Sequence, residues 1–133
     1  MTSIQRLRPT GLVSSPAFSH VAVVPPGATT IYVGGQNAVD ADGKLVGGDD
    51  VAAQAARALA NARIALTAAE ATLGDVVQWT VLLVEGADLA AAYGAIAADL
   101  ASAEPPLVTA ARVAGLGVPG ALVEIAVIAA VVR

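Results

Sequence analysis

The hydrophobic and polar positions alternate with the short period of β-strands in two β-branched runs near the N-terminus. These runs are HVAVVP at residues 20–25 and TTIYVGG at 29–35. The PPGA between them is a turn signal, so the pattern predicts a β-hairpin. DADGK at 40–44 predicts a further turn, and a short extra strand is expected near SIQRL at 3–7.

The period changes to that of a helix at about residue 50. A first helix is predicted from about 50 to 72, ending near Gly74, with aspartates available to cap its start. A second helix is predicted from the N-cap Asp88 until the EPP at 104–106, because proline breaks helices. Its apolar stripe consists of Leu89, Ala92, Tyr93, Ile96 and Leu100.

Three more strands are predicted at 75–85, 107–114 and 121–131, the last two joined by the glycine-rich GLGVPG. We expect these last two strands to be neighbours. The order β-β-α-β-α-β-β indicates an α+β fold, a mixed sheet with two helices packed on one face. The uncovered face of the sheet then has to pack on something, most simply another subunit.

Composition supports one domain, residues 1–133, that associates with copies of itself. Of its residues, 56% are hydrophobic and 14% charged, and large exposed apolar patches are rare on monomers. The net charge of −4, without a Lys/Arg cluster, argues against nucleic acid and anionic membranes as partners. The N-terminus has no apolar segment typical of a signal peptide, and the longest apolar run, 125–132, is too short to span a bilayer, so a cytoplasmic protein is expected.

Metal and thiol chemistry are not expected. The chain has no cysteine, and its one histidine, His20, cannot build a His-rich metal site alone. Its loop aspartates are interpreted as turn and cap residues rather than metal ligands: Asp40, Asp42, Asp49 and Asp50.

The stretch IYVGGQNAVDADGKLVGG at 31–48 resembles the signature of the Rid family, the YjgF/YER057c/UK114 group. The similarity continues through Gln54 and Asn61 and ends in ALVEIAVIA at 121–129, so it covers about residues 10–131. It implies a chorismate-mutase-like fold and a homotrimer with small-molecule clefts between subunits. Family members with the full site hydrolyse imines and enamines derived from amino acids, without a cofactor.

The deaminases of that family bind the substrate carboxylate through the arginine of a PARs motif. The matching stretch here is PPLVTAARVAG, which places Val108 at the arginine position. A shift of one residue gives Leu107 or Thr109, so no alignment supplies an arginine. The resemblance therefore implies an altered site. Thr109 and the backbone N–H groups of this strand remain candidate anion contacts.

Two charged residues of the C-terminal strands are candidates for the site. Arg112 is expected on the same strand face as Val108, about 13 Å away, and we favour an ion pair over a ligand contact for it. Glu124 aligns with the family glutamate that faces the cleft and can position water or move protons. The alternative is a carboxylate satisfied by backbone N–H groups or by an arginine across the trimer.

The other candidate ligand contacts come from earlier in the chain. Phe18 takes the position of a family tyrosine that borders the cleft, and Tyr93 that of an asparagine near the ligand. Gly34 and Gly35 match the family's SG, where glycine allows close approach of a ligand; tight sheet packing is the alternative.

Two functional hypotheses follow from these residues. The first is an imine/enamine deaminase-like hydrolase of altered specificity, with Glu124 as its catalytic group and no metal or organic cofactor. The second is a trimer that binds a small metabolite, or other partners, without turnover. Val108 and Phe18 make the cleft more apolar, which favours an uncharged ligand in both cases.

Overall fold

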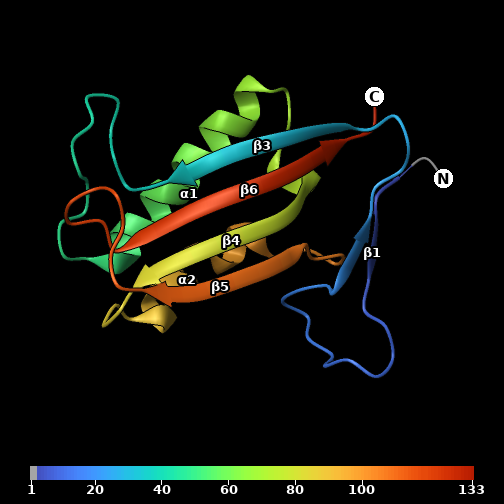
Figure 1. The fold of residues 1–133 in the computed structure, drawn as a ribbon, viewed down its shortest axis with the longest axis horizontal. Coiled ribbons are helices and arrows are strands. Elements are labelled where there is room, and N and C mark those ends of the chain that lie inside the picture. The colour runs from blue at the N-terminus through green and yellow to red at the C-terminus, as the bar shows by residue number, and fades with distance from the viewer. Residues whose placement is uncertain (1–2) are drawn as a thin grey trace.

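A computed structural model describes residues 3–133 and shows a mixed sheet covered on one face by two helices (Figure 1). The elements in chain order are β1 (Gln5–Leu7), β2 (Val21–Val23), β3 (Thr29–Gln36), α1 (Val51–Ala68), the short 3-10 helix η1 (Leu73–Asp75), β4 (Val76–Val84), α2 (Leu89–Leu100), β5 (Leu107–Val113) and β6 (Val123–Val131). The main sheet has the order β3-β6-β4-β5, with β5 parallel to β4 and the other pairs antiparallel. The predicted α+β class and the extra strand near residues 3–7 are confirmed.

The predicted hairpin of residues 20–25 and 29–35 is wrong. The turn between them forms, with the Ala28 amide donating to the Pro25 carbonyl at 3.4 Å, but the two strands separate after it. Strand β2 pairs with β1, and β3 pairs with β6. The turn signal is local, whereas the partner of β3 is decided by burial against the long apolar C-terminal strand.

The last two strands are not neighbours, contrary to expectation. The β4–α2–β5 segment is a crossover, which returns β5 parallel to β4 at the edge of the sheet. The glycine-rich loop then passes over the end of β4, where the Val84 amide donates to the Leu122 carbonyl at 3.0 Å. Strand β6 therefore enters between β3 and β4, and β4 separates Glu124 from residue 108.

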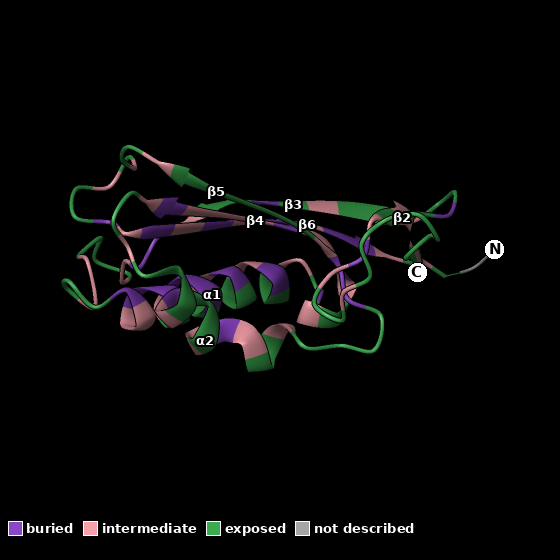
Figure 2. Ribbon diagram, turned by 90° about the horizontal axis from the view of Figure 1, so that it is seen from below, coloured by how far each residue is buried: buried purple, intermediate pink, exposed green. Residues whose placement is uncertain are grey.

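The core lies between the sheet and the two helices (Figure 2). Strand β6 alternates buried and half-buried positions, with Val123, Ile125 and Val127 facing α1. Trp79 is the largest fully buried side chain. Residues of the opposite phase, Glu124 among them, lie on the face of the sheet that no helix covers, called here the open face.

The start of each helix agrees with the prediction. The Asp50 carboxylate accepts from the amides of Ala52 and Ala53, and the Asp88 carboxylate accepts from that of Ala91. These two caps begin α1 and α2. Helix α1 ends at Ala68, a few residues before the predicted end, because Glu70 adopts a left-handed φ of 60° and turns the chain away.

Candidate functional site

The sheet divides the candidate site residues between its two faces. Val108 and Ala110 of β5 point toward α2 and line a cleft. Thr109, between them, has the opposite phase and lies on the open face, where its hydroxyl accepts from the Gln78 amide at 3.2 Å. Glu124 is also on the open face, so Val108 and Glu124 of one chain do not face the same space.

The cleft beside Val108 lies between α2, β4 and β5 and is called here the α2 cleft. Its mouth carries Leu89, Tyr93 and Val108, whose exposed fractions are 47%, 47% and 39%. Trp79 and Ile96 form its floor. No charged side chain of the described residues lines it, and its volume is about 60 Å³. A cavity of about 150 Å³ is needed to hold benzene, so the α2 cleft of one chain is a narrow apolar groove.

Several residues that line this cleft were not singled out from the sequence. Ala110 is one, and Leu89 and Ile96 were assigned to the apolar stripe of the second helix. For Ala110, the signal that could have identified it is the two-residue period of β5, which places it on the same face as Val108.

Arg112 lies at the other end of β5 and does not line the α2 cleft. Its Nη1 donates to the Ala87 carbonyl at 2.9 Å, just before α2 begins. Its strand partner on β4 is Leu83, whereas that of Val108 is Trp79. Within residues 3–133 the one ion pair is Arg63–Asp99, so an ion pair of Arg112 stays a prediction for an interface.

Glu124 lies directly against the backbone of β3. A β-carbon placed on Gly35 would be 2.5 Å from Oε2 of Glu124 and 2.6 Å from its Cδ, whereas Gly34 faces open space. Only glycine at position 35 therefore allows the carboxylate to occupy this position. No hydrogen bond from the described residues reaches the Glu124 carboxylate, which leaves its oxygens available to water or a ligand.

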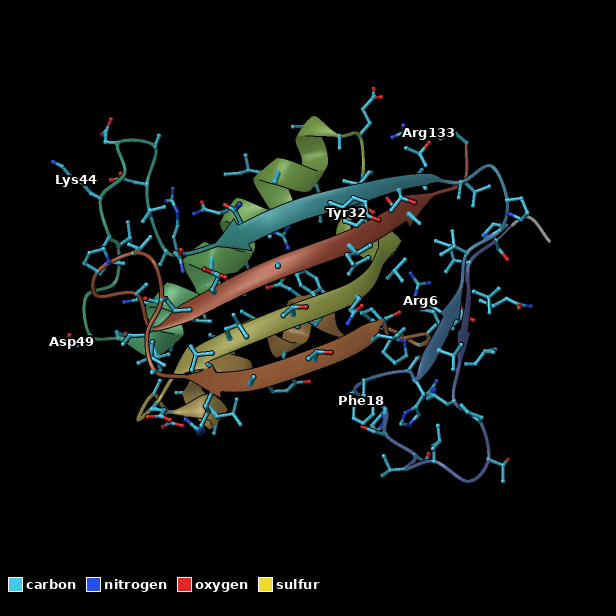
Figure 3. All side chains as sticks on the ribbon, in the orientation of Figure 1. Arg6, Phe18, Tyr32, Lys44, Asp49 and Arg133 are labelled. Carbon is cyan, nitrogen blue, oxygen red and sulfur yellow. The ribbon has the colours of Figure 1, made fainter. Side chains whose placement is uncertain are left out.

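Phe18 belongs to the N-terminal arm, the segment 3–20, beside the α2 cleft. Figure 3 shows Phe18 on this arm. Its neighbour Ala17 lines the cleft, and the Phe18 ring packs edge-to-face on His20 with centroids 5.4 Å apart. The Ser19 amide donates to the Pro106 carbonyl at 3.1 Å, which attaches the arm to the start of β5. Phe18 therefore lies at the edge of the cleft rather than inside it.

The polar motif residues of α1 have structural roles. Gln54 is fully buried; its amide donates to the Gly48 and Gly120 carbonyls, and its oxygen accepts from the Leu122 amide. Asn61 donates to the carbonyls of Asn37 and Val39. These side chains join the loops after β3 and before β6 to α1, and so hold Glu124 and the glycines in place.

Two classes of site have no support among the described residues. No three His, Cys, Asp or Glu side chains of residues 3–133 gather closely enough to hold a metal ion. None of the helices in this part of the chain is long and apolar enough to cross a membrane.

The fold and the cleft define a small α+β protein with a groove at the edge of its sheet, and comparison identifies its family. The sequence model described as "Endoribonuclease L-PSP" matches residues 11–131, so the chain belongs to this family. It is 32% identical to YyfB from Yersinia pestis, a protein of unknown function of the Rid family. That comparison covers 97% of this chain and 98% of that one, with a TM-score of 0.82. The resemblance to the Rid family is thereby confirmed.

Two further solved structures are similar. The YjgF gene product of E. coli is 31% identical over 83% of this chain and 85% of that one, with a TM-score of 0.69. Rv2704 of Mycobacterium tuberculosis, of the YjgF/YER057c/UK114 family, is 28% identical over 97% of this chain and 100% of that one, with a TM-score of 0.65. None of the curated proteins matches the chain.

Proposed function

We propose that this chain forms a homotrimer whose α2 clefts, closed by a neighbouring subunit, hydrolyse a small imine or enamine that carries no carboxylate. The observation that supports the substrate class is the apolar lining of the α2 cleft, which includes Val108, the residue that the sequence alignment places at the family arginine. An apolar groove favours an apolar ligand, and burying a carboxylate there without a partner is costly.

The catalytic group of this proposal is Glu124 of the adjacent subunit. Within one chain Glu124 lies on the open face and Val108 on the helix face, so the proposal requires that the two come together across a subunit boundary. Glu124 takes a proton from water as the water oxygen adds to the imine carbon, and returns a proton to the nitrogen. As the carbon–nitrogen bond breaks, Glu124 takes the proton of the new hydroxyl group and transfers it to the leaving nitrogen, which gives a carbonyl compound and ammonia. An enamine first gains a proton at carbon and loses one from nitrogen to give the imine.

The second candidate is a binding protein without turnover. It is favoured by the narrowness of the groove and by its lack of any charged group that would orient a polar substrate. RNA cleavage, which the family's name suggests, finds less support here, because the chain has a net charge of −4.

Ammonia release separates the two candidates and tests the substrate class. The wild type is compared on freshly generated 2-iminobutanoate and on the imine of a small apolar ketone. Faster ammonia release from the uncharged imine supports the proposed hydrolase. If Glu124→Gln abolishes this release but still binds the ligand, Glu124 is identified as the base. No release from either compound, with saturable binding of the ketone, supports the binding protein. Robust turnover of 2-iminobutanoate would contradict the proposal that the site no longer accepts a substrate with a carboxylate.

Val108→Arg tests whether the arginine-dependent reaction can be restored. A guanidinium here would donate two parallel hydrogen bonds to a substrate carboxylate, worth about 1.5–3 kcal/mol. If these hydrogen bonds form in the transition state, the rate of 2-iminobutanoate hydrolysis should rise about ten- to hundredfold. Val108→Leu is the matched control and should give no increase. A folded trimeric Val108→Arg protein without a gain would show that Val108 does not face the reacting centre.

A further inference from the structure

Arg6 and Glu104 line a polar hollow on the other side of Trp79 from the α2 cleft, called here the Arg6 hollow. Its volume is about 140 Å³, and Asp99 and Ser102 contribute further polar groups to its wall. Trp79, Leu100 and Pro106 line both this hollow and the α2 cleft. The two spaces are therefore neighbours that differ in chemistry, one apolar and the other bearing both signs of charge.

Two backbone carbonyls hold the Arg6 side chain in place, but not all of its N–H groups are hydrogen-bonded. It reaches from β1 toward the near ends of β4 and β5 (Figure 3), and its Nη2 donates to the carbonyls of Gly74 and Val76, at 3.3 and 2.8 Å. Its Nε is buried and has no hydrogen-bond partner among the described residues. Because Nε is closed off from solvent, a ligand in the hollow would reach Arg6 through Nη1, which makes no hydrogen bond to the described residues.

Arg6 and Glu104 carry opposite charges on the wall of one hollow without pairing. Within residues 3–133 the one ion pair within 4.0 Å is Arg63–Asp99, so the guanidinium of Arg6 is not paired with the carboxylate of Glu104, although both side chains line the hollow. A molecule that carries an anion at one end and a cation at the other would bridge this gap. It would satisfy both groups together, whereas a simple anion would leave Glu104 unpaired and be repelled by it.

The hollow has a route of entry. Arg6, Gly74 and Glu104 also line a more open hollow of about 330 Å³ at the end of β6, bordered by Ser3, Ile4 and Val132. A ligand passing through it would meet the charged side chains of Arg6, Asp75 and Glu104 before it reaches the apolar part of the Arg6 hollow. The enclosed volume is close to the ~150 Å³ that holds benzene, which limits the ligand to a small molecule.

We propose that the Arg6 hollow binds a small zwitterion, an α-amino acid with a small side chain, with its carboxylate on Arg6 and its ammonium on Glu104. This site is separate from the α2 cleft and does not rest on the function proposed for that cleft. The two spaces share Trp79, Leu100 and Pro106 as lining residues, so a ligand in one space is expected to change the environment of Trp79 in the other.

The test uses the whole chain and glycine as the probe. Trp79 is the single tryptophan, so its fluorescence reports binding directly. Glycine and L-alanine should give saturable changes, whereas acetate and methylammonium, which carry one charge each, should not. The Nε–H signal of Arg6 in a ¹⁵N spectrum should shift with the same apparent Kd. No saturable response to glycine, or equal binding of acetate alone, would overturn the proposal.

Substitutions test which side chains of the hollow bind glycine. Arg6→Gln and Glu104→Gln should each weaken glycine binding at least tenfold. Arg6→Gln can also loosen the N-terminal arm, so Glu104→Gln, at an exposed residue, is decisive. Arg8→Gln is the matched control, because Arg8 donates to the Ser15 and Ala103 carbonyls from the same arm and lines neither hollow. Unchanged affinity for glycine in Glu104→Gln would refute the proposed pairing.

Discussion

Gly35 shows how one missing side chain determines where a carboxylate can lie. Glu124 rests against its backbone, at a distance that a β-carbon would not allow. The atoms that a methyl group would meet belong to the end of a flexible side chain, and Gly35 does not have a left-handed φ. The fold can therefore tolerate a larger residue, but the carboxylate has to move.

Gly35→Ala is accordingly expected to separate stability from site chemistry. The melting temperature should fall by only a few degrees, because the change displaces one side chain at the sheet surface. Activity or ligand affinity that depends on Glu124 should fall about tenfold or more. Gly34→Ala is the control, since its β-carbon would meet nothing within 4 Å. Equal effects of the two substitutions would show that the position of Glu124 against β3 is not important.

The end of α1 shows the same kind of constraint on the scale of an element. The Ala71 amide donates to the Leu66 carbonyl and the Glu70 amide to that of Thr67, which is the hydrogen-bond pattern of a Schellman motif. The residue in the left-handed position of this motif is usually glycine. Here it is Glu70, with a φ of 60°.

Glu70→Gly is therefore expected to stabilise the protein. Removal of the side chain relieves a left-handed conformation that costs an L-residue about 1 kcal/mol, so the free energy of unfolding in urea should rise by up to about that amount. Glu70→Ala keeps the β-carbon and should give no comparable gain. A loss of stability in Glu70→Gly would mean that the flexibility it adds to the unfolded chain is the larger effect.

These elements also show what the sequence could and could not predict. Asp50 and Asp88 marked the helix starts because capping is chemistry between near neighbours. The end of α1 was misplaced because Glu70 carries no glycine-like signal. The pairing of β3 with β6 joins residues about a hundred positions apart, and no local pattern contains that information. The same gap affected the site. Val108 and Thr109 were both candidates for one cleft but lie on opposite faces of the sheet, and the position of β4 between Val108 and Glu124 depends on the sheet order.

On the scale of the whole molecule, the open face and the apolar mouth of the α2 cleft predict assembly. Tyr32 on β3 has an exposed fraction of 76%, and Tyr93 and Val108 are also exposed at the cleft. The resemblance to the Rid family implies that this assembly is a trimer, so light scattering at micromolar concentration should give about three times the chain mass of 13.0 kDa. A monomer would remove the subunit boundary on which the proposed role of Glu124 depends.

The sheet order also determines when this protein can fold during its synthesis. Strand β6 comes last in the chain but lies inside the sheet, so until residues 123–131 leave the ribosome β3 has no partner and Asn37 cannot donate to the Val123 carbonyl. Stalled nascent chains that expose the protein only through residue 113 should be digested readily by protease. Chains stalled far enough downstream to expose β6 should resist digestion. Resistance of the shorter chains would mean that α1, α2 and β4 form a stable unit without the strand that later separates β3 from β4.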